Sequence, residues 1–173
     1  MRRHFTPAVR DVVAHAKEEA LASGNTRIEI PHLLLGLSRS TEDPCGELMR
    51  KHGFNAEMVR TKVRVGSPDK GGITILLSRQ VEELLKRSAF SAFLHSDRLI
   101  HPFNVLLTFL EHVSGPAWLI DHLADIGLDH DPVLKELHDD DERLRSRYRA
   151  WLGSGVAHDV IRSTGFKRIL AWT

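Results

Sequence analysis

A pattern near the start of this chain occurs a second time, and this internal repeat constrains the fold more than any other feature. Phe5-Thr6-Pro7 begins one helical pattern, and Leu77-Ser78-Arg79 begins another 72 residues later in the same register. A fixed-offset repeat is typical of a duplicated supersecondary unit. We therefore expect two similar halves related by a pseudo-twofold axis, with a binding groove between them. The matched positions are Val9, Val12, Val13, Ala16, Ala20, Ile28, Leu33, Leu34, Leu35 and Leu37, which fall on Val81, Leu84, Leu85, Ser88, Ala92, Ile100, Val105, Leu106, Leu107 and Phe109.

Apolar side chains recur in both copies at steps of three and four, the spacing of an amphipathic helix. Four helices are expected in each copy, most of them beginning at a proline or a capping residue. Two β-branched stretches, 26–30 and 73–77, are too short to change this interpretation. The sequence predicts an all-α fold, a duplicated four-helix repeat with a C-terminal helical extension. The expected helices cover 7–22, 31–40 and 44–53, with a fourth after Asn55, and their counterparts begin near Ser78, Pro102, Pro116 and Asp129.

The chain divides into four parts along its length. Residues 1–65 form the first repeat, 66–76 a linker rich in turn formers, 77–138 the second repeat and 139–173 the extension. In the extension, apolar Leu144 and Trp151 lie seven apart, and arginines alternate from 143 to 149. This pattern is typical of an amphipathic helix that packs on the second repeat or binds a partner.

Composition excludes several classes of function. The chain has 24 Lys and Arg against 23 Asp and Glu, so its formal charge of +1 argues against non-specific binding to nucleic acid or to a membrane surface. No run of 18 apolar residues predicts a membrane-spanning helix. Cys45 is the single cysteine and cannot form an internal disulfide, which suits a reducing compartment, so a cytoplasmic location is expected.

No pattern of catalytic or metal-binding residues stands out. Among the 11 histidines, His122 with Asp125, and the run Asp129-His130-Asp131, come nearest to a ligand set, but a metal site needs three or four converging ligands. The chain has neither a phosphate-binding Gly-x-x-x-x-Gly-Lys-Ser/Thr loop nor a Gly-x-Ser-x-Gly elbow. We expect no catalytic residue, no metal and no cofactor; a hydrolase or metalloenzyme is the weakest alternative.

The repeated segments also resemble a known family. Phe5-Thr6-Pro7, the Ala-rich helix with Glu18-Glu19-Ala20, and the run His32-Leu33-Leu34-Leu35-Gly36-Leu37 look like the Clp amino-terminal repeat. The resemblance covers about residues 4–138 and is stronger in the first copy. In that family, two repeats form the all-helical front domain of bacterial unfoldases of the ClpA and ClpC type. That domain receives adaptors and substrates, some of them arginine-phosphorylated, and passes them to ATP-driven rings.

The resemblance implies a non-catalytic docking module. Because no nucleotide loop is present, we expect a stand-alone module that binds substrates, adaptors or Clp components and modulates regulated proteolysis. The family commonly has a glutamate that holds phospho-arginine, but Pro31 and Phe103 occupy those positions here, which predicts a more apolar pocket around Phe103. The candidate binding residues are Phe5, Thr6, Leu77, Ser78 and Phe103.

The sequence leaves an alternative open. A sensor or sequestering protein that holds an apolar small molecule or peptide between the repeats would use the same groove. The expected partners are proteins or peptides, and the oligomeric state is not fixed by the sequence.

Overall fold

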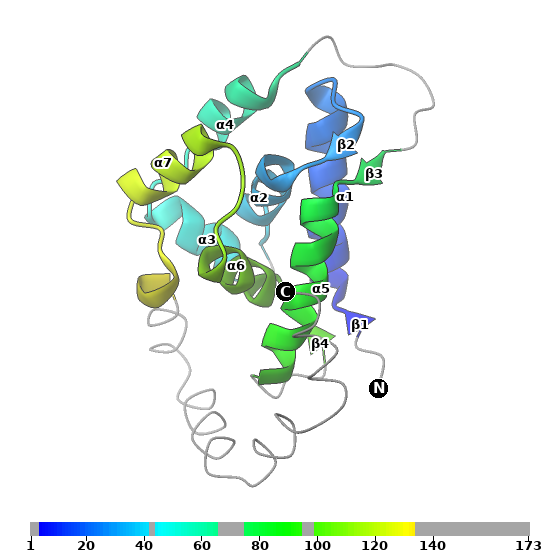
Figure 1. The fold of residues 1–173 in the computed structure, drawn as a ribbon, viewed down its shortest axis with the longest axis vertical. Helices are drawn as coiled ribbons and strands as arrows, with labels where there is room; N and C mark the ends of the chain where they lie inside the picture. Colours follow the sequence, from blue (N-terminus) through cyan, green and yellow to red (C-terminus); the bar gives the residue numbers. More distant parts are fainter. Residues whose placement is uncertain (1–3, 42–43, 66–74, 95–98, 134–173) are drawn as a thin grey trace, which may run out of the picture.

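The computed structural model describes residues 4–41, 44–65, 75–94 and 99–133, and it is predominantly helical (Figure 1). A further helix begins at His130 and continues to Val133, the last described residue. The all-α fold with two equivalent repeats is therefore confirmed; most of the expected linker and the whole extension, 139–173, lie outside the described residues. The elements are β1 His4–Phe5, α1 Pro7–Ala22, β2 Arg27–Ile28, α2 Ile30–Ser38, α3 Pro44–Lys51, α4 Ala56–Val63, β3 Leu76–Leu77, α5 Arg79–Leu94, β4 Leu99–Ile100, α6 Pro102–Glu111 and α7 Ala117–Asp125.

Helix α1 begins and ends where its sequence indicates. The side-chain oxygen of Thr6 accepts a hydrogen bond from the N–H of Val9 at 3.3 Å, and Pro7 occupies the first turn. Gly24, with a φ of 75°, follows the C-cap residue Ser23 and adopts the left-handed conformation that glycine tolerates best. One face of the helix is buried, and it consists mainly of Val9, Val12, Ala16 and Ala20.

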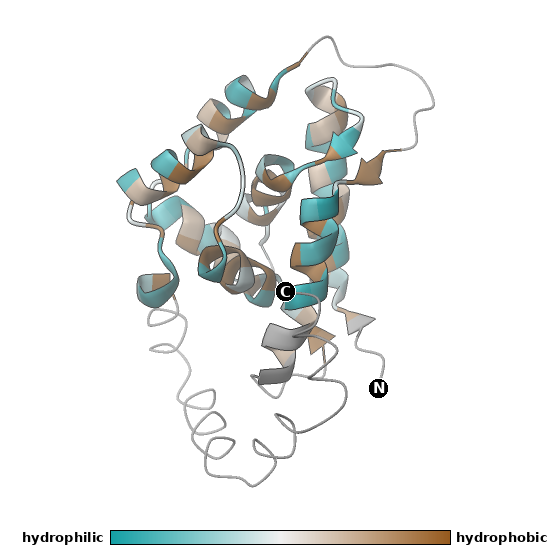
Figure 2. Ribbon diagram, in the orientation of Figure 1, coloured by the Kyte–Doolittle hydropathy of each residue, from teal (hydrophilic) through white to brown (hydrophobic). Residues whose placement is uncertain are grey.

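Helix α2 forms the centre of the first repeat and is buried along its whole length. It packs against α1, α3 and α4 and reaches α5 of the second repeat. Figure 2 shows this helix surrounded by the others, with polar residues gathered on the outer helices. Because all its faces are covered, α2 carries the continuous Leu33-Leu34-Leu35 run instead of an alternation of polar and apolar residues.

Gly36 allows α2 to approach α1 closely. A Cβ at this position would lie 2.3 Å from the backbone oxygen of Val12 and 3.1 Å from the backbone nitrogen of Ala16. No side chain fits at that distance, so the Gly in the His-Leu-Leu-Leu-Gly-Leu run is required by packing.

In the second repeat, residues with hydroxyl groups stand at the two positions that make this close contact in the first. Thr108 stands at the position of Gly36, and Ser88 at that of Ala16. Both are buried, and each hydroxyl donates to a carbonyl of its own helix: Thr108 to Asn104 at 2.6 Å and Ser88 to Leu84 at 2.8 Å. Each hydroxyl is thereby satisfied inside the core.

Two short parallel strand pairs join the repeats, a feature that the sequence interpretation did not include. In the first pair His4 is opposite Leu99, and in the second Arg27 is opposite Leu76. Adding 72 to residue 4 gives 76, and subtracting 72 from 99 gives 27, so each pairing is the image of the other under the repeat offset. This reciprocity supports the pseudo-twofold relation.

The same pairs fix the direction of the two long helices. β1 precedes α1 and pairs with β4, which follows α5; β2 follows α1 and pairs with β3, which precedes α5. Helices α1 and α5 therefore run antiparallel, with one strand pair at each end (Figure 1). Strand β3 begins at Leu76, the last residue of the expected linker.

Substituting Gly36 should destabilise the first repeat. We expect Gly36→Ala to lower the free energy of unfolding by at least about 2 kcal/mol, because the added methyl meets helix backbone that cannot move aside cheaply. Gly127→Ala is the control: nothing lies within 4 Å of its Cβ, and only its φ of 63° opposes the change, at a cost of about 1 kcal/mol. Urea unfolding followed by circular dichroism measures both. Equal losses in the two variants would contradict the close approach of α1 and α2.

Candidate functional site

Two strand pairs, which we call the repeat junctions, hold the candidate residues Phe5 and Leu77, and Thr6 and Ser78 directly follow them: junction A is β1 with β4, and junction B is β2 with β3. At junction A the N–H of Thr6 donates to the carbonyl of Ile100 at 3.0 Å. At junction B the N–H of Ser78 donates to the carbonyl of Ile28 at 2.9 Å. Each long helix is thus anchored at its first turn to the other repeat.

The hydroxyls of Thr6 and Ser78 act as helix caps. The Ser78 oxygen accepts from the N–H of Val81 at 3.4 Å, as the Thr6 oxygen does from Val9 at 3.3 Å. Thr6 is buried and Ser78 half-buried. The backbone N–H of each residue therefore holds a junction, and its side chain caps the long helix that follows.

The structure divides the five candidate residues between the two ends of α1. Phe5 and Thr6 lie at junction A, and Phe103 follows three residues after Ile100, in the first turn of α6. Leu77 and Ser78 lie at junction B, at the opposite end (Figure 1). The candidate residues therefore fall at two positions related by the repeat, and the structure does not bring all five together in one groove.

Phe103 and Pro31 hold equivalent positions with different surroundings. Phe103 is half-buried, and its ring stacks on that of His101 with centroids 5.5 Å apart. Pro31 is buried in the first turn of α2. Neither side chain can pair with a guanidinium as a carboxylate would; an apolar pocket around Phe103 stays a prediction.

Sequence reasoning missed two exposed leucines. Leu76 in junction B is 56% exposed, and Leu99 in junction A is 41% exposed. Their counterparts in the other copy are polar, His4 and Arg27. An apolar residue that replaces a polar one at an equivalent surface position is the signal that could have identified them.

A buried histidine holds the loop that leads into β2. The Nδ1 of His32 accepts from the N–H of Glu29 at 3.1 Å, which places the proton on Nε2, 3.2 Å from the Ser23 oxygen. Ser23 in turn donates to the carbonyl of Glu19 at 2.7 Å. Burial lowers the pKa of His32 to about 4, although the nearby Glu19 charge opposes the shift. The imidazole is therefore neutral at pH 7.

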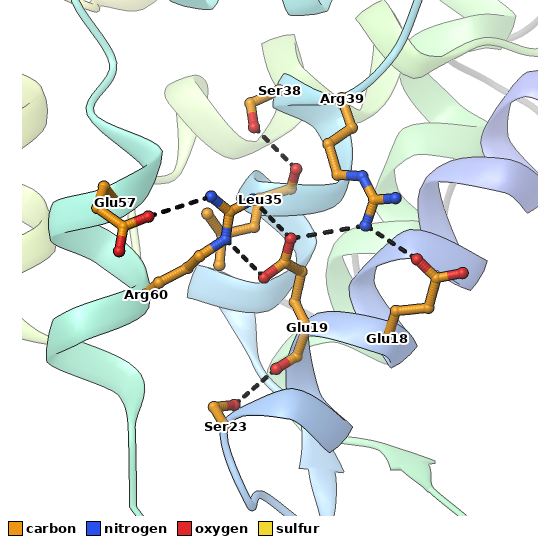
Figure 3. A network of polar contacts seen from close by, with 8 residues as sticks. All are labelled: Glu18, Glu19, Ser23, Leu35, Ser38, Arg39, Glu57 and Arg60. Carbon is orange, nitrogen blue, oxygen red and sulfur yellow. Dashed lines mark hydrogen bonds and ion pairs between the residues drawn. The ribbon is translucent and has the colours of Figure 1, made fainter. Parts of the chain in front are cut away.

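An ion-pair network fixes the neighbouring helices (Figure 3). Arg60 of α4 donates through Nε and Nη2 to both carboxylate oxygens of Glu19, at 2.9 and 2.8 Å. Arg39, at the end of α2, lies 3.6 Å from Glu19 and 2.9 Å from Glu18. The hydrogen bonds from Arg60 hold the pKa of Glu19 below its usual value. This two-pronged contact ties α1 to α4 on the side of junction B.

The second repeat has a different residue at the position of His32. Asn104 stands where the first repeat has His32, and its Oδ1 accepts from the N–H of His101 at 2.8 Å. Its Nδ2 is buried, with no hydrogen-bond partner among the described residues. Among the described residues, the support around position 104 of the second repeat therefore differs from that around His32 in the first.

Comparisons with known proteins identify the family. Residues 4–121, more than half of the chain, match the family described as the Clp repeat (R) N-terminal domain. The chain belongs to this family. The curated protein "Negative regulator of genetic competence ClpC/MecB" of Bacillus subtilis (strain 168) is 26% identical over 115 residues. That match covers 65% of this chain and 14% of the relative, so the chain spans a small part of that protein.

Solved structures have the fold of this Clp repeat domain. A chain from "preliminary structural investigations of a malarial protein secretion system" aligns with a TM-score of 0.65 at 16% identity, covering 79% of this chain and 93% of that one. The N-terminal domain of the "Caseinolytic protease associated chaperone ClpD from Arabidopsis thaliana" aligns with a TM-score of 0.53 at 19% identity, covering 86% and 95%.

The described part of this Clp repeat domain shows no metal-binding group of three or more His, Cys, Asp or Glu side chains. His130 pairs with Asp131 at 3.0 Å, and His122 accepts from the N–H of Asn55 at 3.3 Å. His122 therefore contributes to the contact between the repeats. None of the described helices has the length and apolar character needed to cross a bilayer.

Acid should destabilise the domain through His32. In the unfolded chain its pKa is near 6.5 and in the folded protein about 4, so the unfolded state binds the proton between these values. Stability is retained above pH 6.5 and is lost as the pH falls towards 4, by about 3 kcal/mol in total. Urea midpoints between pH 7.5 and 4 measure this loss.

The control for this experiment is His32→Gln, which keeps an acceptor for the Glu29 N–H. Its stability should fall less steeply over the same interval, because the lowered pKa of Glu19 makes that carboxylate contribute to the loss only near the acidic end of the interval. Parallel curves for the two proteins would contradict the assignment to His32.

Proposed function

We propose that this Clp repeat domain is a non-catalytic module that binds extended segments of other polypeptides at its repeat junctions. The observation that carries the proposal is the pair of exposed leucines, Leu76 and Leu99, each in a two-stranded parallel sheet. Within the described residues each sheet has two strands only, so each has open edges. Open edges accept a further strand through backbone hydrogen bonds, and neighbouring apolar side chains add affinity.

Clients of this kind include unfolded substrates, adaptors and Clp components. Family membership supports a role in Clp-dependent regulated proteolysis, in which the module presents or withholds a polypeptide. Phe5, Thr6 and Phe103 would serve junction A, and Leu77 and Ser78 junction B. Because Pro31 and Phe103 provide no carboxylate, apolar segments are favoured over phospho-arginine as ligands.

Binding should depend on the exposed side chains of the junctions. A fluorescent, reduced and carboxymethylated α-lactalbumin is the probe, and anisotropy titration gives its Kd. We expect Leu76→Ser and Leu99→Ser each to raise the Kd about 3- to 10-fold, through loss of apolar contact area, and Phe103→Ala to have a similar effect. Because Leu76 and Leu99 are largely exposed, their replacement should leave the fold intact, which circular dichroism verifies.

Val113→Ser is the matched control, since Val113 is 39% exposed but lies between α6 and α7, outside both junctions. Its Kd should equal that of the unchanged protein. Equal Kd values for all four variants would exclude the junctions as the binding site, and a folded protein that does not bind the probe would argue against the function itself.

A further inference from the structure

Within the described residues, helix α7 presents an exposed face with an apolar strip. Leu119 and Leu123 are buried, whereas Ile120 is 37% exposed. Ala117 and Ala124 are also exposed, and they lie three residues before and four residues after Ile120. Residues at these spacings share one side of a helix, so the three form a continuous strip, which we call the α7 strip.

Acidic side chains border this strip. Asp121 and Asp125 are exposed, one turn apart, and Asp129 follows beyond the helix end. Among the ion pairs between described residues, none joins these three carboxylates to a lysine or arginine. Like charges four residues apart destabilise a helix, and Asp125 at the C-terminal end also opposes the helix dipole. A cationic partner would relieve both effects.

The same chain carries a segment of matching character just beyond the described part. Residues 143–152 read Arg-Leu-Arg-Ser-Arg-Tyr-Arg-Ala-Trp-Leu. At helical spacing, Leu144, Tyr148 and Trp151 share one side, and four arginines border it on both flanks. The chemistry therefore complements an apolar strip beside aspartates.

The connection is long enough. The described chain ends at Val133, and residues 134–143 can span up to about 33 Å when extended. Helix α7 has nine residues and is about 13 Å long. We propose that the α7 strip docks residues 143–152 of its own chain, with arginines paired to Asp121 and Asp125.

Paramagnetic relaxation tests the proposal in the full-length protein. A nitroxide is attached at Ser146→Cys, the buried Cys45 remaining shielded from the reagent, and amide signals of the isotope-labelled chain are recorded. The signals of Ile120 and Ala124 should lose at least half of their intensity relative to those of Asp11 on α1. The double variant with Asp121→Lys and Asp125→Lys should restore the intensities of these two signals.

Matched variants keep the test conclusive. Asp11→Lys changes an exposed carboxylate on α1 and should leave the broadening of the α7 signals unchanged. If the double variant with Asp121→Lys and Asp125→Lys unfolds, the neutral double variant with Asp121→Asn and Asp125→Asn takes its place. When Arg145→Glu and Arg149→Glu are added to the double lysine variant, opposite charges face each other again, so the signals of Ile120 and Ala124 should broaden again.

Broadening that appears only when nitroxide-bearing and isotope-labelled chains are mixed would assign the strip to a second copy and overturn the proposal. Unaffected α7 signals in both samples would overturn it as well. The junction experiment uses other residues, so either proposal can fail alone.

Discussion

The exchange of strands between the two repeats is the constraint on which the rest of the structure depends. Each repeat supplies the strand before its long helix to the other, and one backbone hydrogen bond from Thr6 or Ser78 closes each junction. Because the pairs lie at opposite ends of α1 and α5, they set the antiparallel order of these helices. Helix α2, buried in the first repeat, also contacts α5 of the second.

The two copies keep this frame and differ inside it. The first repeat brings α1 and α2 into close contact at Gly36. The C-terminal end of α1 is fixed by His32 with Ser23 and by the Glu19–Arg60 ion pair. The second accommodates Thr108 at the position of Gly36 by bonding its hydroxyl to its own helix. Duplication has thus preserved the apolar positions while the polar contacts between helices diverged, which explains why the family motif is clearer in the first copy.

Sequence reasoning recovered the helices because their signals are local. Thr6 with Pro7, and Asn55 before α4, mark helix starts, and the helix-ending glycines Gly53 and Gly127 both have positive φ. The two-residue strands carry a weak local signal at most: β2 and β3 lie in the β-branched stretches 26–30 and 73–77, but their pairing depends on a distant segment. For the same reason the placement of the candidate residues at two ends could not be foreseen: it depends on which strand each one meets. Leu76 and Leu99 were detectable only by comparing the copies at surface positions.

The reciprocal pairing also has a consequence for how the chain is made. β1 meets β4 at a sequence separation of 95, from residue 4 to residue 99. A ribosome adds about 5–20 residues per second, so the leading strand waits on the order of 5–20 s before its partner is synthesised. During that interval the first half carries an unsatisfied backbone edge. Contacts of such long range also slow folding, whereas the packing of α2 on α1 is local in sequence and can form before β4 is made.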